Sequence, residues 1–390
     1  MSILKDTDKQ YVAGTYARFP VEIVSGKGSL VYDENGKEYI DMGSGIAVSS
    51  FGIADGEWVS AVSAQLAKVQ HTSNLYYTEP CALLAKTLCE KTGMKKVFFS
   101  NSGAEANECA IKVARKYASD KKGADFFTII TLENSFHGRT ITTLSATGQE
   151  HYHELFKPLT PGFVHTPVND LENLKKLVLE HKTAAIMIEC IQGEGGVNAL
   201  DKEFVKGISE ICSKEDILFI VDEVQTGNGR CGELYAYMNF GVQPDVVSTA
   251  KGLGGGLPIG AALLGEKVAN TLGFGDHGST FGGNPVCCAG ALSIINRIDG
   301  SFLNEVKKKS DYIFKSLECA KGVKSVSGMG LMIGIETELP AGDIVKKCIE
   351  NGVLCLTAKN KVRLLPALNV PDELICKAIK IIKKACAGEL

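Results

Sequence analysis

The chain has 390 residues, of which 45% are hydrophobic and 22% charged, and its formal net charge is −3. This composition is ordinary for a globular protein, and the length suggests two domains. The small net charge argues against nucleic acid as the main partner. No uncharged apolar run approaches the roughly 20 residues that a membrane span requires.

The N-terminal stretch "MSILKDTDKQ" mixes charges with only two aliphatic residues, so it does not resemble a secretory leader, and we expect a cytoplasmic protein. The thirteen cysteines form no CxxC pair. We interpret them as small buried residues in a reducing compartment. His151 and His153 are two positions apart, a spacing that does not share a helix face, so we predict no metal site.

The predicted elements change character along the chain. Residues 21–42, "VEIVSGKGSLVYDENGKEYIDM", read as short strands broken by glycines and the turn "DENGK". From about residue 55, apolar runs of strand length alternate with helical segments; these runs are "KKVFFS", "DFFTIITL", "AAIMIEC", "DILFIVDE", "PDVVSTA" and "GAALLG". Among the helices, "AEANECAIKVARKY" has an apolar stripe of Ala106, Ala110, Val113 and Tyr117. The alternation predicts an α/β domain with a mainly parallel sheet flanked by helices.

Beyond about residue 295 the pattern predicts a smaller α+β unit. Its strand candidates are "KSVSGMGLMIGIET" and "KVRLLPALNV", and the chain closes with a helix in "PDELICKAIKIIKKACAG". We therefore predict three parts: an N-terminal segment, 1–54, that packs with the small domain; a large domain, 55–290; and a small C-terminal domain, 291–390.

Polar residues follow two of the predicted strands, where ligands bind in open α/β sheets. In "FFSNSGAEAN", Ser102, Gly103 and Ala104 lie between a strand and a helix, so they form either an anion site or a simple turn. "LFIVDEVQTG" ends its strand with Asp222 and Glu223. Either both acids cap the turn, or Asp222 meets a buried cation. "GNGRCG" matches GxGxxG, but its distance from the strand argues against a dinucleotide site.

Lys251 lies between the apolar run "PDVVSTA" and the glycine-rich "GLGGG". Apolar surroundings disfavour the ammonium form, which lowers the pKa and exposes a nucleophilic amine. The alternative is a surface lysine with an apolar stem. Together with "NSFHGRT", the features at strand ends match what pyridoxal 5'-phosphate requires. Its aldehyde would take Lys251, its phosphate the helix N-terminus, its ring nitrogen Asp222 and its ring face Phe136.

Six motifs resemble those of the fold-type I, class III aminotransferases, in the same order and over nearly the whole chain: "SNSGAEANECAIK", "SFHGRT", "IQGEGG", "VDEVQTGNGR", "STAKGLGGGLPIGA" and "HGSTFGGNP". The resemblance implies that Lys251 carries the cofactor and moves the proton, while Asp222 keeps the ring nitrogen protonated. It implies a homodimer with shared active sites. The remaining implied cofactor contacts are Ser102, Gly103 and Ala104 at the phosphate, Phe136, Val224 and Gln225 at the ring, and Thr280 at the phosphate of the neighbouring subunit.

The resemblance also implies how substrates bind. Arg139 and Arg363 would take carboxylates, Glu194 would pair with Arg363 and release it for 2-oxoglutarate, and Glu189 and Ser279 would line the same pocket. "TYARFPVEIVSGKG", "GSGIAVSSFG" and "HTSNLYYTEP" are most similar to members that act on N2-acetyl-L-ornithine. The stretch "GSGIAV" lacks a tyrosine that ornithine-specific members carry, which favours an acylated donor.

Several alternatives stay open. The donor could be N-succinyl-diaminopimelate, ornithine or 4-aminobutyrate. Two alternatives belong to other classes of protein. A cofactor-dependent aminomutase is disfavoured by two arginines that suit a dicarboxylic acceptor. A non-catalytic binding protein is disfavoured because Lys251 and Asp222 are both retained. One departure from the family is "IADGEW" after "SSFG", where a turn with histidine and proline is usual.

Overall fold

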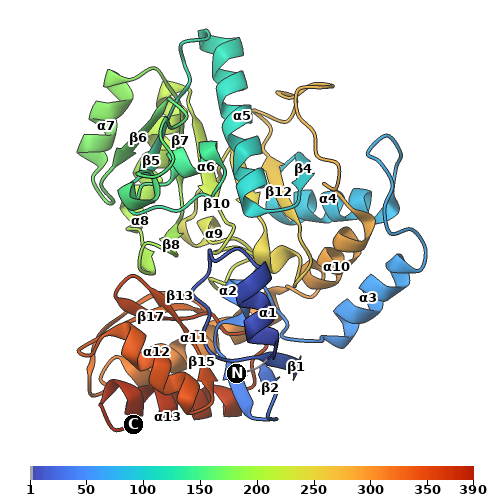
Figure 1. Cartoon of the computed structure of the whole chain (residues 1–390). Coiled ribbons are helices and arrows are strands. Elements are labelled where there is room, and N and C mark those ends of the chain that lie inside the picture. Colours follow the sequence, from blue (N-terminus) through green and yellow to red (C-terminus); the bar gives the residue numbers. More distant parts are fainter. Residues whose placement is uncertain (1–2) are drawn as a thin grey trace.

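The computed structural model describes residues 3–390, which form two lobes (Figure 1). The larger lobe is built on a seven-stranded sheet. In spatial order its strands are β4 (Lys96–Ser100), β12 (Gly260–Leu264), β11 (Val246–Thr249), β10 (Leu218–Asp222), β7 (Thr183–Ile188), β5 (Thr128–Leu132) and β6 (Phe163–Thr166). Strands β11, β10, β7, β5 and β6 are parallel, and β12 runs antiparallel to both of its neighbours. The predicted mainly parallel sheet is therefore confirmed.

Both faces of this sheet are buried, as its continuous apolar strands predict. In β10, Leu218 and Ile220 face a core shared with α5 (Gly103–Lys122), whereas Phe219 and Val221 face the core on the other side. The second face is covered in part by α8 (Lys202–Glu215). Such two-sided burial holds the sheet rigid and fixes the positions of the loops at its edge.

The other elements of the large lobe are helical or very short. Helix α10 (Pro285–Ile295) packs against α3 (Gly56–Leu66) and α4 (Glu79–Thr92). The remainder comprises α6 (Ile141–Ala146), α7 (Leu171–Glu180), α9 (Tyr237–Phe240), the pair β8 (Ile191–Gln192) and β9 (Asn198–Ala199), and two 3-10 turns, Glu150–Tyr152 and Lys251–Leu253. The predicted stripe of α5 is buried: Ala106, Ala110, Val113 and Tyr117 all face the core.

The smaller lobe combines two four-stranded sheets with three helices. One sheet has the order β1 (Ile23–Lys27), β2 (Leu30–Asp33), β3 (Glu38–Asp41) and β15 (Val353–Leu354). The other has the order β13 (Val323–Met329), β14 (Met332–Thr337), β17 (Lys361–Leu364) and β16 (Leu356–Ala358). The helices are α11 (Gly300–Leu317), α12 (Ala341–Glu350) and α13 (Asp372–Cys386), the last lying where the sequence predicts it. Val31, Tyr39, Ile40 and Met42 share one core with these C-terminal elements.

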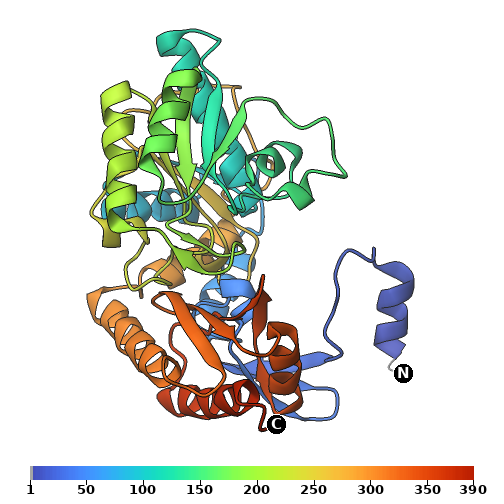
Figure 2. The ribbon, with the colours of Figure 1, turned by 90° about the vertical axis from the view of Figure 1, so that its left-hand side faces the viewer.

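Segments that are distant in the sequence meet between the lobes. Ala47, the last residue of α2 (Ser44–Ala47), and Phe51, which lies after it, belong to the core that contains Phe219 and Val221 rather than to the core of the smaller lobe. The three-part division at residues 54 and 290 remains a prediction. Helix α1 (Ile3–Tyr11) has no buried residue and projects from the rest of the chain (Figure 2), although Lys5 Nζ lies 3.5 Å from Glu34 Oε1 in the turn after β2.

Within residues 3–390 no single helix is long and apolar enough to cross a membrane. The one pair that reaches that length together, α10 and α11, is bent by 73° at its break.

Candidate active site

The parallel strands end at one edge of the large sheet, and the predicted site residues follow them there. Strand β10 ends at Asp222, and β11 leads to Lys251 through one residue. Strand β4, which runs parallel to β11, leads to Ser102 at the start of α5. Phe136 and Glu189 follow β5 and β7. Strand ends that share one edge bring these side chains together.

A cavity of about 440 Å³ lies at this edge, within the range of small-molecule sites. Ten of the sequence-predicted residues line it: Ser102, Gly103, Ala104, Phe136, Arg139, Glu189, Asp222, Val224, Gln225 and Lys251. Glu194, Ser279, Thr280 and Arg363 do not line it. The structure thus brings Lys251 and Asp222 into the same pocket.

Lys251 opens a 3-10 turn and has a backbone φ of 45°, in the left-handed region that side chains rarely adopt. No hydrogen bond or ion pair to its amine occurs among residues 3–390. The side chain is partly exposed because the pocket is open, yet the surrounding protein desolvates the amine and lowers its pKa. Nearby negative charges raise the pKa of Lys251 but do not cancel this shift; they belong to Asp222, Glu194 and Glu189. The lysine is therefore an available amine rather than half of a salt bridge.

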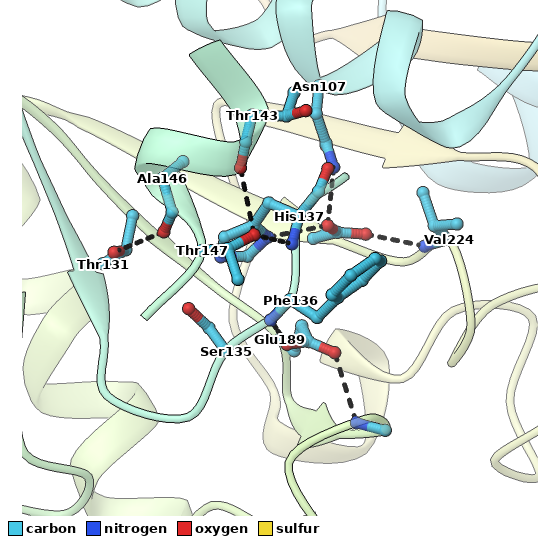
Figure 3. Close-up of polar contacts among 12 residues, drawn as sticks. Asn107, Thr131, Ser135, Phe136, His137, Thr143, Ala146, Thr147, Glu189 and Val224 are labelled. Atoms are coloured by element: carbon cyan, nitrogen blue, oxygen red, sulfur yellow. Dashed lines mark hydrogen bonds and ion pairs between the residues drawn. The ribbon is translucent and has the colours of Figure 1, made fainter. Parts of the chain in front are cut away.

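Three donors hold the buried Asp222 carboxylate, and Figure 3 labels each of them: Asn107, His137 and Val224. Asn107 Nδ2 lies 2.7 Å from Oδ2, and His137 Nδ1 lies 2.8 Å from the same oxygen. The backbone N–H of Val224 donates to Oδ1 at 3.0 Å. Buried carboxylates require such partners, and their number fixes the direction of the side chain.

Glu223, the neighbour of Asp222, has a different environment. It is completely buried and does not line the cavity. Thr226 Oγ1 donates to its Oε2 at 2.5 Å, and the backbone N–H of Tyr237 donates to its Oε1 at 2.8 Å. Burial raises the pKa of Glu223 to about 7. Successive side chains of a strand point to opposite faces, so Asp222 faces the pocket and Glu223 faces the core.

The start of α5 has the features of an anion site. The first N–H groups of a helix have no partner inside the helix, and the helix dipole favours negative charge there. Ser102 is the N-cap, and its hydroxyl accepts a hydrogen bond from the backbone N–H of Glu105 at 3.2 Å. Gly103 lies against Val224, because a Cβ at Gly103 would be only 2.6 Å from Val224 Cγ1. The absence of a side chain at Gly103 thus allows the start of α5 to contact the segment that follows β10.

Two acids follow β7, and their surroundings differ. Glu189 is buried and accepts hydrogen bonds from the backbone N–H of Phe136 at 2.8 Å and of Gly193 at 3.2 Å. Burial is the main reason that its pKa is raised to about 7. Burial also acts upward on the pKa of Glu194, but the adjacent Arg363, together with Lys251 and Gln225, outweighs it and holds that pKa below its usual value.

Arg363, on β17 of the smaller lobe, reaches across to the large lobe. Its Nη1 lies 2.5 Å from Glu194 Oε1 and donates to Gln225 Oε1 at 3.2 Å. Gln225 Nε2 in turn donates to Glu194 Oε1 at 3.3 Å. These three side chains form a closed group beside the cavity, in which the arginine charge is balanced by one carboxylate.

Ser279 and Thr280 lie in the segment between β12 and α10. The Ser279 hydroxyl accepts a hydrogen bond from Asn101 Nδ2 at 3.1 Å, next to the start of α5. Thr280 is exposed. Neither residue lines the cavity of its own chain.

The comparisons with known proteins agree with this geometry. The model of the family "Aminotransferase class-III" matches residues 11–386. The chain belongs to the class-III aminotransferases. Among the curated relatives of this aminotransferase is the acetylornithine aminotransferase of Haemophilus ducreyi, 51% identical over 97% of each chain. That of Methanocaldococcus jannaschii is 46% identical over 94% of each chain.

Solved structures of other aminotransferases have the same fold. The N-acetylornithine aminotransferase of Stenotrophomonas maltophilia superposes with a TM-score of 0.85 at 35% identity and 98% coverage of both chains. An ornithine aminotransferase of Toxoplasma gondii superposes with a TM-score of 0.94 at 33% identity, covering 99% of this chain and 94% of that one. That structure has PLP at partial occupancy in its active site.

Among the cavity residues that the sequence did not predict, two of this class-III site are the side-chain partners of Asp222. Asn107 lies on the buried side of α5, and His137 follows Phe136 in "SFHGRT". An asparagine within the apolar stripe of a helix is a signal that could have identified Asn107, because a buried amide needs a partner. His137 gives no comparable signal, since its contact depends on how the loop after β5 folds back over β10.

Proposed function

We propose that this chain transfers the δ-amino group of N2-acetyl-L-ornithine to 2-oxoglutarate, giving N-acetylglutamate 5-semialdehyde and L-glutamate, a step of arginine biosynthesis. The observation that carries the proposal is the near-full-length similarity to several relatives named acetylornithine aminotransferase. The pocket supports it, because it combines an available amine, a buried carboxylate and an arginine.

Pyridoxal 5'-phosphate is the cofactor that we propose for this pocket. The residues fit it in three places: the unpartnered Lys251 amine, the Asp222 carboxylate held by three donors, and the helix N-terminus where Gly103 leaves room. When bound, the cofactor supplies an aldehyde and a ring that accepts electrons from the substrate.

Lys251 and Asp222 would perform the proton chemistry. Lys251 would hold the cofactor covalently between turnovers; once released, its amine would move a proton at the substrate carbon that bears the nitrogen. Its lowered pKa leaves a larger share of the amine unprotonated near neutral pH, as a base requires. Asp222 would hold a proton on the ring nitrogen, and Asn107 and His137 keep its carboxylate aimed in one direction.

Other pocket residues would bind and orient the cofactor. The ring of Phe136 and the side chain of Val224 offer apolar surfaces for the two faces of a flat ring. Gln225 would lie near the phenolic oxygen of the cofactor. The N–H groups at Ser102, Gly103 and Ala104 would bind the phosphate.

The two arginines would bind substrate carboxylates. Arg139 lines the cavity and would take the carboxylate of the acetylated donor. Arg363 is neutralised by Glu194, so it would receive a second carboxylate only when that acid moves aside, as 2-oxoglutarate requires. Glu189 and Ser279 would complete the substrate pocket.

A homodimer is the assembly that we propose. Large apolar side chains are exposed in the segments before α4 and before α10, among them Tyr77, Phe274 and Phe281. Asn74 Nδ2 donates to the carbonyl of Ser279 at 2.9 Å, so the segment before α4 and the segment before α10 lie together. Apolar surface of this kind is typical of protein interfaces. Thr280, exposed in the segment before α10, would then reach the phosphate bound by the neighbouring subunit.

We place this enzyme in the cytoplasm. Its thirteen cysteines are free thiols in the structure, which is typical of proteins in reducing compartments.

A donor panel tests the proposed function. The purified enzyme is given 2-oxoglutarate with N2-acetyl-L-ornithine, N-succinyl-diaminopimelate, ornithine or 4-aminobutyrate, and glutamate formation is measured. We expect the highest kcat/KM with N2-acetyl-L-ornithine and no turnover without 2-oxoglutarate. A higher kcat/KM for another donor would identify that donor as the substrate instead. Turnover that does not need 2-oxoglutarate would indicate an aminomutase.

Lys251→Ala tests the cofactor chemistry. The variant should bind pyridoxal 5'-phosphate without the covalent link that borohydride fixes in the wild type, and it should lose turnover. Full activity in this variant would remove Lys251 from the proposal.

A further inference from the structure

The guanidinium of Arg139 lies against two aromatic rings. Its Cζ is 4.2 Å from the ring centroid of Tyr152 and 5.5 Å from that of Phe136. The two rings meet edge to face, with centroids 5.9 Å apart and an interplanar angle of 70°. No hydrogen bond or ion pair to the guanidinium occurs among residues 3–390. Aromatic contacts alone therefore position this arginine.

This arrangement suits an arginine that waits for an anion. An aromatic face attracts a guanidinium through its ring electrons and does not use the N–H groups in the guanidinium plane. Those N–H groups remain free to bind a carboxylate through two parallel hydrogen bonds. Because Arg139 is exposed and has many rotamers, a ring that limits them reduces the entropy lost on binding.

The segment that carries Tyr152 is anchored on both sides. Tyr152 ends the 3-10 turn Glu150–Tyr152. Before this turn, Gln149 Nε2 donates to the carbonyl of Ser135 at 3.0 Å, one residue before Phe136. After it, the buried His153 places Nε2 2.9 Å from the carbonyl oxygen of Leu144 in α6. The turn is thus tied to the same stretch of chain that carries Phe136 and Arg139.

A third ring lies against Tyr152 at a tilt of 42°. The imidazole of His151 has its centroid 3.9 Å from that of Tyr152. No hydrogen bond involves the Tyr152 hydroxyl within residues 3–390, so the contact with Arg139 depends on the ring and not on the hydroxyl.

We propose that Tyr152 is a positioning residue for substrate recognition: its ring holds Arg139 in the orientation that binds the carboxylate of the amino donor. The inference rests on the proposed role of Arg139 and adds a residue outside the cavity to that role. It implies that Tyr152 affects the binding of a donor only if the donor carries that carboxylate.

Tyr152→Leu and Tyr152→Phe test this in the holoenzyme. With N2-acetyl-L-ornithine, Tyr152→Leu should raise KM about three- to tenfold and change kcat less than about twofold, the range expected for one cation–π contact. Tyr152→Phe should behave as the wild type, because it keeps the ring.

The matched probe is N-acetylputrescine, which has the same amine and acetyl group but no carboxylate. The kcat/KM of the wild type and of Tyr152→Leu for this amine should be equal. An equal loss with both donors would show a merely structural role and overturn the proposal, as would a Tyr152→Phe variant as impaired as Tyr152→Leu. Tyr152→Gln is measured in the same way should the leucine variant melt at lower temperature.

A failure of the proposed function gives a different result. If the wild type does not use N2-acetyl-L-ornithine, the donor panel shows this before any variant is made. The same comparison is then made with the preferred donor and its analogue without the carboxylate. A KM that Tyr152→Leu leaves unchanged for the preferred donor would overturn the role of Tyr152 itself.

Discussion

Glu223→Gln should change how the stability of this enzyme depends on pH. Glu223 is buried behind the pocket, and burial raises its pKa from the ordinary value of 4.5 to about 7. Glutamine has the same shape and carries no charge. Its oxygen can accept from the backbone N–H of Tyr237, and its amide can donate to the Thr226 hydroxyl, which accepts as well as donates.

The sign of the effect follows from the raised pKa. The folded protein keeps the proton on Glu223 at a pH where the unfolded chain has lost it. Protonated Glu223 therefore contributes fully to the free energy of unfolding below pH 4.5. This contribution falls as the pH rises toward 7, and it does not change further above that pH. A shift of the pKa from 4.5 to about 7 lowers the free energy of unfolding of the wild type by about 3 kcal/mol at high pH. The Glu223→Gln variant has no ionisable group at this position, so its free energy of unfolding does not fall for this reason.

Urea unfolding of the cofactor-free protein at pH 5 and pH 8 measures this difference. The fluorescence of Trp58, the only tryptophan, reports the transition, and the subunit concentration is kept constant. The free energy of unfolding of Glu223→Gln minus that of the wild type should rise by about 2–3 kcal/mol from pH 5 to pH 8. Glu210→Gln, at an exposed position of α8, is the control and should show no such rise. Parallel pH profiles for the wild type and Glu223→Gln would refute the reasoning.

Two further substitutions test the neighbouring contacts. Glu189→Gln, unlike the change at Glu223, should lower the free energy of unfolding at pH 5 by about 1–3 kcal/mol. At that pH the carboxyl group is protonated, but both of its oxygens can still accept from backbone N–H groups, whereas an amide nitrogen cannot and leaves one N–H unpaired. Equal stability in urea at pH 5 would contradict this. Gly103→Ala should weaken pyridoxal 5'-phosphate binding about tenfold or more in an absorbance titration, since its Cβ would be 2.6 Å from Val224 Cγ1. Adding Val224→Ala should restore much of the affinity, and Gly56→Ala, which has no atom within 4 Å of its added Cβ, should have no effect.

The sequence predicted those strands whose apolar runs are continuous. Strand β10 and the end of β11 lie where "DILFIVDE" and "PDVVSTA" place them, because residues buried on both faces must be apolar at every position. Strand β6 was missed. It is the edge strand of the sheet, is only partly buried, and carries His165 and Thr166 among its four residues, so it lacks that pattern. The two-residue β15 is too short to give any periodic signal.

The sequence by itself determined the main chemical groups of this protein and their local settings: a lysine after a buried strand, an acid at a strand end and a glycine at a helix start. These depend on the order of residues along a few turns of chain. Only the tertiary structure decided which groups meet. Asn107 and His137 share one oxygen of Asp222, and Arg363 reaches Glu194 across 169 positions of sequence. Periodicity reports which face of an element is buried, whereas the partner of a buried polar group is set by how distant elements pack against one another.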